Sequence, residues 1–202
     1  MVVAPGERFA AAIAKAFDEL STRDIGLVAS NSGGVASGRE LRVKVLDRTA
    51  VVDADAKTVR WEGGGEPEDD LKVVLLHYIL GSDGRIDGRW SSFREFESGS
   101  LYYSVFQGRA LVPLVSAFGT DPAKLAAASV RLGGTRVDRG DASFDFLFFP
   151  YLKVNVTLWK GDEEVPASGN ILFDSAAGRF LGAEDLAHLA EEIVDMLARQ
   201  PP

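Results

Sequence analysis

Cysteine is absent from the sequence of 202 residues, and histidine occurs only twice. Without cysteine the chain cannot form disulfides, present a thiolate nucleophile, or hold zinc or an iron–sulfur cluster through sulfur. No cofactor is evident from the residues that remain, and the composition leaves open a divalent cation bound through oxygen. A cysteine-free chain also fits a cytoplasmic location.

Basic residues are scarce as well, because 22 lysines and arginines stand against 30 aspartates and glutamates, for a net charge of −8. Nucleic-acid binders need a basic face, and anionic membranes attract basic segments, so we expect neither as a partner. The longest strongly apolar run, residues 73–80, is far below the about 20 residues that cross a bilayer. The first residues lack the basic-then-apolar pattern of a secretory signal, so we expect a soluble cytoplasmic protein.

The apolar pattern predicts a single α+β domain over residues 1–202. The composition is 46% hydrophobic and 26% charged, as in globular proteins, and no repeat or linker divides the chain. Helical and strand patterns come in blocks, which favours a mainly antiparallel sheet with flanking helices from both chain ends. The predicted helices are 7–20, 71–80, 101–118 with a break near Pro113, 122–132 and 183–198, and the predicted strands are a three-stranded meander within 39–61, then 143–149, 154–159 and 170–173.

Several familiar motifs are missing. Residues 33–40 carry two glycines five apart, as in a phosphate loop, but Arg39 and Glu40 stand where that loop needs lysine and then serine or threonine. No Gly-x-Ser-x-Gly elbow occurs. Neither histidine belongs to an HExxH-type pair, so we interpret His77 as a core histidine and place His188 on the exposed half of the last helix.

The most prominent polar stretch lies between two predicted strands, within residues 158–174. Asp162 and Glu163 stand together in its acidic run, and Asp141 and Asp174 lie at the ends of neighbouring strands. If these strand ends meet at one edge of the sheet, the carboxylates provide a site for Ca²⁺ or Mg²⁺ or a pair for acid–base chemistry. The alternative is an ordinary solvated acidic turn.

A second candidate is a pocket for a ligand. Trp90, Arg94 and Glu95 lie in a loop bounded by glycines. Trp159 ends the predicted strand before the acidic run, and Asp162 lies in that run. An aromatic residue with a charged pair is typical of a small-molecule site. The alternative is a loop held by a buried tryptophan and a local Arg–Glu ion pair.

These residues also carry a resemblance to a known family, the prokaryotic domain of unknown function DUF3786. The likeness covers nearly the whole chain and rests on an ordered set of short blocks. They are Leu76-His77-Tyr78, Trp90, Phe93-Arg94-Glu95, Phe118-Gly119, Gly140-Asp141, Phe149-Pro150, Leu158-Trp159, Gly161-Asp162-Glu163-Glu164, Pro166-Ala167, Leu172-Phe173-Asp174 and Glu184-Asp185.

The resemblance implies a protein of anaerobic bacteria or archaea, and it implies no reaction. Some members carry a separate four-cysteine iron–sulfur module, and this chain lacks those cysteines. Val165 departs from the pattern, because an aromatic residue is expected after the acidic run.

Three functional hypotheses follow. The first is a non-catalytic ligand- or partner-binding accessory protein in anaerobic redox or cofactor metabolism, because no nucleophile–base pair is found. The alternative is an enzyme assisted by a divalent metal held by Asp141, Asp162, Glu163 and Asp174. The third is a structural subunit whose last helix docks on a protein partner.

Overall fold

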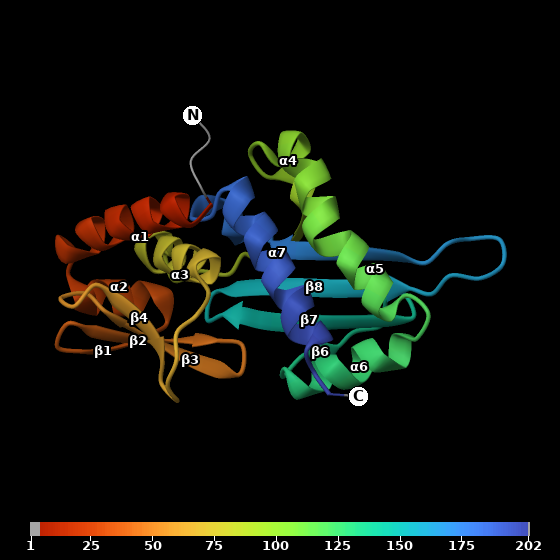
Figure 1. Ribbon diagram of the computed structural model, residues 1–202, viewed down its shortest axis with the longest axis horizontal. Coiled ribbons are helices and arrows are strands. Elements are labelled where there is room, and N and C mark those ends of the chain that lie inside the picture. The colour runs from red at the N-terminus through yellow and green to blue at the C-terminus, as the bar shows by residue number, and fades with distance from the viewer. Residues whose placement is uncertain (1–4, 202) are drawn as a thin grey trace.

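The computed structural model describes residues 5–201, with side chains from Phe9 onward. Two antiparallel sheets lie side by side, with strand orders β1-β2-β3-β4 and β5-β9-β8-β7-β6, and helices cover them (Figure 1). The prediction of an α+β fold is confirmed, although the strands form two sheets and not one. The prediction about a secretory signal draws on residues 1–4, which lie outside the described residues.

The N-terminal half builds the smaller sheet and the helices beside it. Asp24 begins α2 by accepting a hydrogen bond from the Leu27 N–H, and Gly33 ends that helix in the left-handed region, φ 67°. The elements in this half are α1 (Pro5–Ser21), α2 (Ile25–Ser32), β1 (Val35–Ser37), β2 (Glu40–Val45), β3 (Arg48–Asp53), β4 (Thr58–Trp61) and α3 (Asp69–Gly81). The meander therefore has one strand more than predicted, because residues 35–37 pair with β2.

A long, irregular helix crosses the front of the molecule in Figure 1. It consists of α4 (Gly99–Phe106), a π turn (Gln107–Leu111) and α5 (Val112–Phe118). Pro113 has no N–H to donate to the carbonyl four residues earlier, and the π turn lies directly before it. The disturbance predicted near Pro113 is thus a widened turn in a helix that continues.

The larger sheet forms the floor of the C-terminal half. Its central strand alternates: Val154, Val156 and Leu158 face the apolar core, and the residues between them face the opposite, more polar side. The strands are β5 (Trp90–Ser92), β6 (Thr135–Arg136), β7 (Ala142–Phe149), β8 (Leu152–Trp159) and β9 (Ser168–Asp174). The turn between β8 and β9 projects beyond the body of the molecule (Figure 1).

The last helix, α7 (Ala183–Ala198), lies across this sheet and between the other helices (Figure 1). Leu186, Leu189, Ile193 and Leu197 are buried along one face of α7, as its amphipathic pattern predicts. Helix α6 (Pro122–Arg131) and 3-10 helices at Phe93–Glu95 and Ser175–Arg179 complete the fold. Among the helices of residues 5–201, none has both the length and the apolar character needed to cross a bilayer.

Candidate functional site

The two tryptophans of the predicted ligand pocket do not meet. Trp159 pairs with Ser168 at the start of β9, and Trp90 pairs with Asp174 at its end. Strand residues advance by about 3.3 Å each, so the ends of β9 lie about 20 Å apart. Both tryptophans project from the polar face of the sheet, but at opposite ends. The structure therefore forms no pocket that contains both.

Arg94 and Glu95 have separate roles close to Trp90. The guanidinium of Arg94 lies 3.7 Å from the centre of the Tyr103 ring, in a cation–π contact. The carboxylate of Glu95 accepts a hydrogen bond from the Ser92 N–H and caps the 3-10 helix, which lowers the pKa of Glu95. The Arg–Glu ion pair proposed for this loop is thus replaced by a stacking contact and a cap.

Asp141 and Asp162 lie at the same end of the larger sheet and serve its turns. Asp141 accepts the Lys160 N–H at 2.7 Å. Asp162 accepts the N–H groups of Glu164 and Val165 at 2.9 and 2.8 Å, and these two bonds lower its pKa. Glu163 is exposed in the same turn. The acidic run therefore forms a hydrogen-bonded turn at the projecting end of the sheet.

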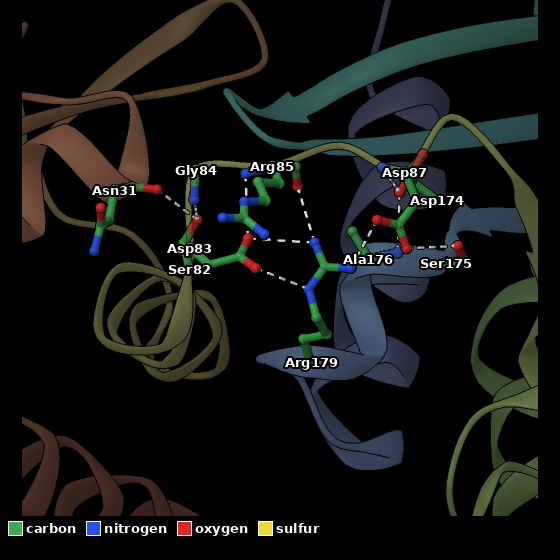
Figure 2. Close-up of polar contacts among 10 residues, drawn as sticks. All are labelled: Asn31, Ser82, Asp83, Gly84, Arg85, Asp87, Asp174, Ser175, Ala176 and Arg179. Atoms are coloured by element: carbon green, nitrogen blue, oxygen red, sulfur yellow. Dashed lines mark hydrogen bonds and ion pairs between the residues drawn. The ribbon is translucent and has the colours of Figure 1, made fainter.

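Asp174 lies at the other end of β9, so the three aspartates do not converge. Its side chain is buried and accepts the N–H groups of Asp87 and Ala176, both at 2.9 Å (Figure 2). It also accepts the Gly88 N–H at 2.7 Å. Arg179 reinforces the same loop by pairing with Asp83 and Asp87, at 3.0 and 2.7 Å. The carboxylate that was a predicted metal ligand instead fastens the loop before β5 to the sheet.

Both histidines, in contrast, line one small cavity between α1, α3 and α7. The cavity has a volume of about 140 Å³, and its wall includes Phe9, His77, Asp185 and His188. The Phe9 ring meets His188 edge-on, with 5.5 Å between ring centres. We call this space the histidine cavity. Two prediction errors follow, because His77 is only half-buried and His188, placed on an exposed face by its pattern, is buried.

His77 is oriented by a carboxylate from the facing helix. Its Nδ1 atom lies 3.0 Å from both oxygens of Asp185, which also accepts the Gly182 N–H at the start of α7. The hydrogen bond to Asp185 raises the pKa of His77, and partial burial opposes that rise. With Nδ1 engaged, Nε2 is the ring nitrogen left for another partner.

His188 belongs to a tighter charged group. Asp70 Oδ2 and Glu191 Oε2 lie 3.6 and 3.7 Å from His188 Nδ1. An Arg109 terminal nitrogen lies 3.1 Å from His188 Nε2, and Arg109 Nε lies 3.8 Å from the Glu191 carboxylate. The contact with His188 lowers the pKa of Asp70, whereas desolvation raises the pKa of Glu191.

The π turn supplies the cation of this group. Arg109 lies inside it, and the Val112 N–H bonds to the Gln107 carbonyl, five residues earlier. A π turn inserts one residue into an α-helix and so changes the direction of the side chains that it carries. Here it sets Arg109 against α7, where His188 and Glu191 project.

An acidic groove continues from this group along α7. Two adjoining cavities, of about 240 and 310 Å³, share Glu68, Glu192 and Arg199 in their walls. Phe9 lines both the larger cavity and the histidine cavity. We define the acidic groove by its carboxylates Glu68, Asp69, Asp70, Glu191, Glu192 and Asp195. Its apolar floor includes Trp61, Leu71 and Met196.

Glu192, which lines both groove cavities, is held in an unfavourable environment for a carboxylate. Burial and the neighbouring Asp70 raise its pKa to about 6. Asp195 and Glu68 act in the same direction, and Arg199 opposes them. Near neutral pH the groove therefore holds closely spaced negative charge that its own arginines only partly balance.

A family model described as a domain of unknown function, DUF3786, matches residues 24–196. The chain belongs to the DUF3786 family. No curated protein and no solved structure matches it. The matched residues of this DUF3786 chain include both histidines, Arg109 and the groove carboxylates, whereas Phe9 precedes the match.

Sequence reasoning missed this part of the DUF3786 chain, although two patterns pointed to it. Glu191 follows His188 by three residues and therefore lies on the same helix face. Asp185 and His188 have the same spacing, so one face of α7 carries two acids and an imidazole. The contributions of Asp70, His77 and Arg109 depend on the packing of α3 and the π turn against α7, which no local pattern shows.

Proposed function

We propose that this DUF3786 protein is a non-catalytic binding protein whose ligand is a small organic cation held in the acidic groove. The observation that carries the proposal is Glu192, a partly buried carboxylate among like charges whose pKa is raised to about 6. Burial and like charges both disfavour the ionised carboxylate, and a bound cation offsets both, so this position favours cation binding.

The floor of the groove supports a cation with an apolar body. The guanidinium of Arg48 already lies 3.7 Å over the Trp61 ring, so this ring face accommodates a positive charge. Aliphatic amines combine ammonium groups for the carboxylate rim with methylene groups for Leu71 and Met196. A polyamine-like molecule has this chemistry.

Binding without catalysis is favoured by the residues that line the groove. Among the residues whose side chains are described, Phe9 to Pro201, no serine, threonine, tyrosine or histidine lines either cavity, so none of them offers a hydroxyl nucleophile or an imidazole base there. An accessory role in anaerobic redox or cofactor metabolism is inferred from the family resemblance alone.

Calorimetric titration with spermidine at pH 7.5 and low salt tests the proposal. We expect saturable binding that weakens as salt rises, because exposed charges are screened. Glu192→Gln should weaken binding by about tenfold, since a tenfold change corresponds to about 1.4 kcal/mol and a close charge pair at a partly buried position contributes an energy of that order. Glu164→Gln makes the same charge change in the projecting β8–β9 turn and serves as the control. Equal affinities for both variants and wild type would refute the groove as the site.

A second candidate function, a metal-assisted enzyme, is favoured by one observation. The His77–Asp185 pair opens on the cavity that His188 also lines. An imidazole whose Nδ1 is held by a carboxylate is suited to act as a general base through Nε2. Hydrolysis of activated esters or phosphate esters that depends on added metal and is lost in His77→Gln would support this candidate, and absence of turnover with every metal would remove it.

A further inference from the structure

The inner end of the acidic groove has the ligand set of a metal ion. One nitrogen of His188 and one oxygen each of Asp70 and Glu191 all lie within 4.8 Å of one another. Asp70 comes from the first turn of α3, and the other two residues are three apart on α7. Three ligands on two packed helices need only small side-chain movements to surround one ion.

The donor types narrow the class of ion. An imidazole nitrogen suits zinc, manganese, iron, cobalt or nickel, whereas calcium and magnesium prefer oxygen alone. Three protein ligands with positions left for water are typical of open, reactive sites rather than closed structural ones. Water has access from both sides, because His188 lines the histidine cavity and Asp70 and Glu191 line the acidic groove.

Arg109 provides an independent observation that a cation belongs here. Its guanidinium contacts both His188 and Glu191, and it reaches them from a π turn, a rare conformation frequent at functional sites. The guanidinium therefore partly balances the Glu191 carboxylate in the free protein. The Arg109 side chain is about one-third exposed, so it has solvent to move into when another cation arrives.

We propose that Asp70, His188 and Glu191 form a site for a divalent first-row transition-metal ion, and that Arg109 is the counter-ion that the metal displaces. The proposal extends the proposed cation-binding function to a second, inner position. It rests on that function only in assigning both cations to one acidic surface.

Titration of the metal-free protein with Co²⁺, followed by visible d–d absorption and by competition with Zn²⁺, tests the site. Wild type should bind one equivalent and develop absorption of the kind that nitrogen ligation produces. Glu191→Gln, a change at a half-buried position, should weaken Co²⁺ binding by about tenfold or more. It removes a charged ligand, and even changes to the groups that orient ligands cost about tenfold or more in metal affinity. His188→Gln should alter the spectrum as well as the affinity. Arg109→Met should tighten binding by about tenfold, because it removes the competing charge.

Controls separate this proposal from the groove proposal and from nonspecific binding. Asp162→Asn changes the acidic turn at the far end of the sheet and should leave Co²⁺ binding unchanged. Spermidine titration of wild type and Asp162→Asn reports the groove, because Glu191 is itself one of the groove carboxylates. The proposed metal site is wrong if Co²⁺ gives no saturable absorption, or if wild type and His188→Gln give identical spectra. If spermidine still binds in either case, the groove proposal stands. If Co²⁺ binds as described and spermidine does not, the groove proposal alone fails. Weaker Co²⁺ binding in Arg109→Met would overturn the counter-ion role.

Discussion

The Nδ1 atom of His77 lies 3.0 Å from each carboxylate oxygen of Asp185, so a single imidazole joins α3 to α7. The contact links helices from the two halves of the chain, on the wall of a cavity that also contains His188. Since the carboxylate stabilises the imidazolium, the pKa of His77 is raised in the folded protein. The contribution of this contact to stability therefore depends on pH.

The first prediction concerns that dependence. A histidine whose pKa is raised on folding stabilises the protein fully below its unfolded value of about 6.5, and the contribution disappears as pH rises through the folded value. Asp185→Asn should lower the pKa of His77, measured by NMR, and reduce the free energy of unfolding more at pH 5.5 than at pH 9. The variant also weakens the hydrogen bond from the Gly182 N–H to residue 185, and this loss of stability is the same at both pH values. The difference between the losses at pH 5.5 and pH 9 therefore measures the His77–Asp185 ion pair. An equal loss at both would contradict this prediction.

The second prediction concerns Glu192, whose raised pKa also makes stability fall as pH rises, here because burial and like charges disfavour the ionised carboxylate. A carboxyl group with a raised pKa favours the folded state while protonated, so stability should fall as pH rises from about 4.5 to about 6. Glu192→Gln should remove this fall and make the protein more stable at pH 7.5 by about 1 kcal/mol, after allowance for solvent screening at a partly exposed group.

Urea denaturation of wild type and Glu192→Gln at pH 4 and pH 7.5 measures this effect. Wild type and Glu192→Gln should have nearly equal free energies of unfolding at pH 4, where Glu192 is mostly protonated in both the folded and the unfolded state. A variant that is more stable at neutral pH but binds spermidine less tightly is the expected result of a charge retained for function. A variant that is less stable at pH 7.5 would show that the groove does not strain Glu192.

The third prediction concerns Asp174. Asp174→Ala leaves the N–H groups of Asp87, Gly88 and Ala176 without their acceptor and should cost about 3 kcal/mol or more, because bonds to a buried charged group are strong. Thermal unfolding measures the loss. Asp162→Ala is the matched control, since that carboxylate also accepts backbone N–H groups but is exposed, and its midpoint should move little. Similar losses for both variants would contradict the structural role assigned to Asp174.

Local sequence patterns predicted the elements well and their arrangement less well. The apolar stripe of α7 follows from helical periodicity, and it is observed. The predicted sites failed to assemble because they depend on strand register. Trp90 lies beside Asp174 only because β5 pairs antiparallel with the end of β9, and nothing within either segment indicates that pairing.

The histidine cavity was missed for a related reason. Helix α3 is apolar on most of its surface, so the single polar residue in its middle, His77, was interpreted as a core residue. Its partner Asp185 lies on a helix 108 residues later. The burial of His188 depends on Phe9 and Arg109, which come from two further segments. Contacts among four separate segments are a property of packing, and sequence periodicity describes one segment at a time.

The Asp174 carboxylate also acts as a cross-link between residues 86 and 87 positions apart in the chain, in a protein that has no covalent one. A disulfide between such distant positions also restricts the unfolded chain, whereas this bridge exists only in the folded protein, where it fixes the loop before β5 to the end of β9. Unlike a disulfide, this bridge needs no oxidant to form and no reductant can break it. The fold is therefore indifferent to the thiol–disulfide balance of its surroundings, and its assembly requires no oxidative folding step.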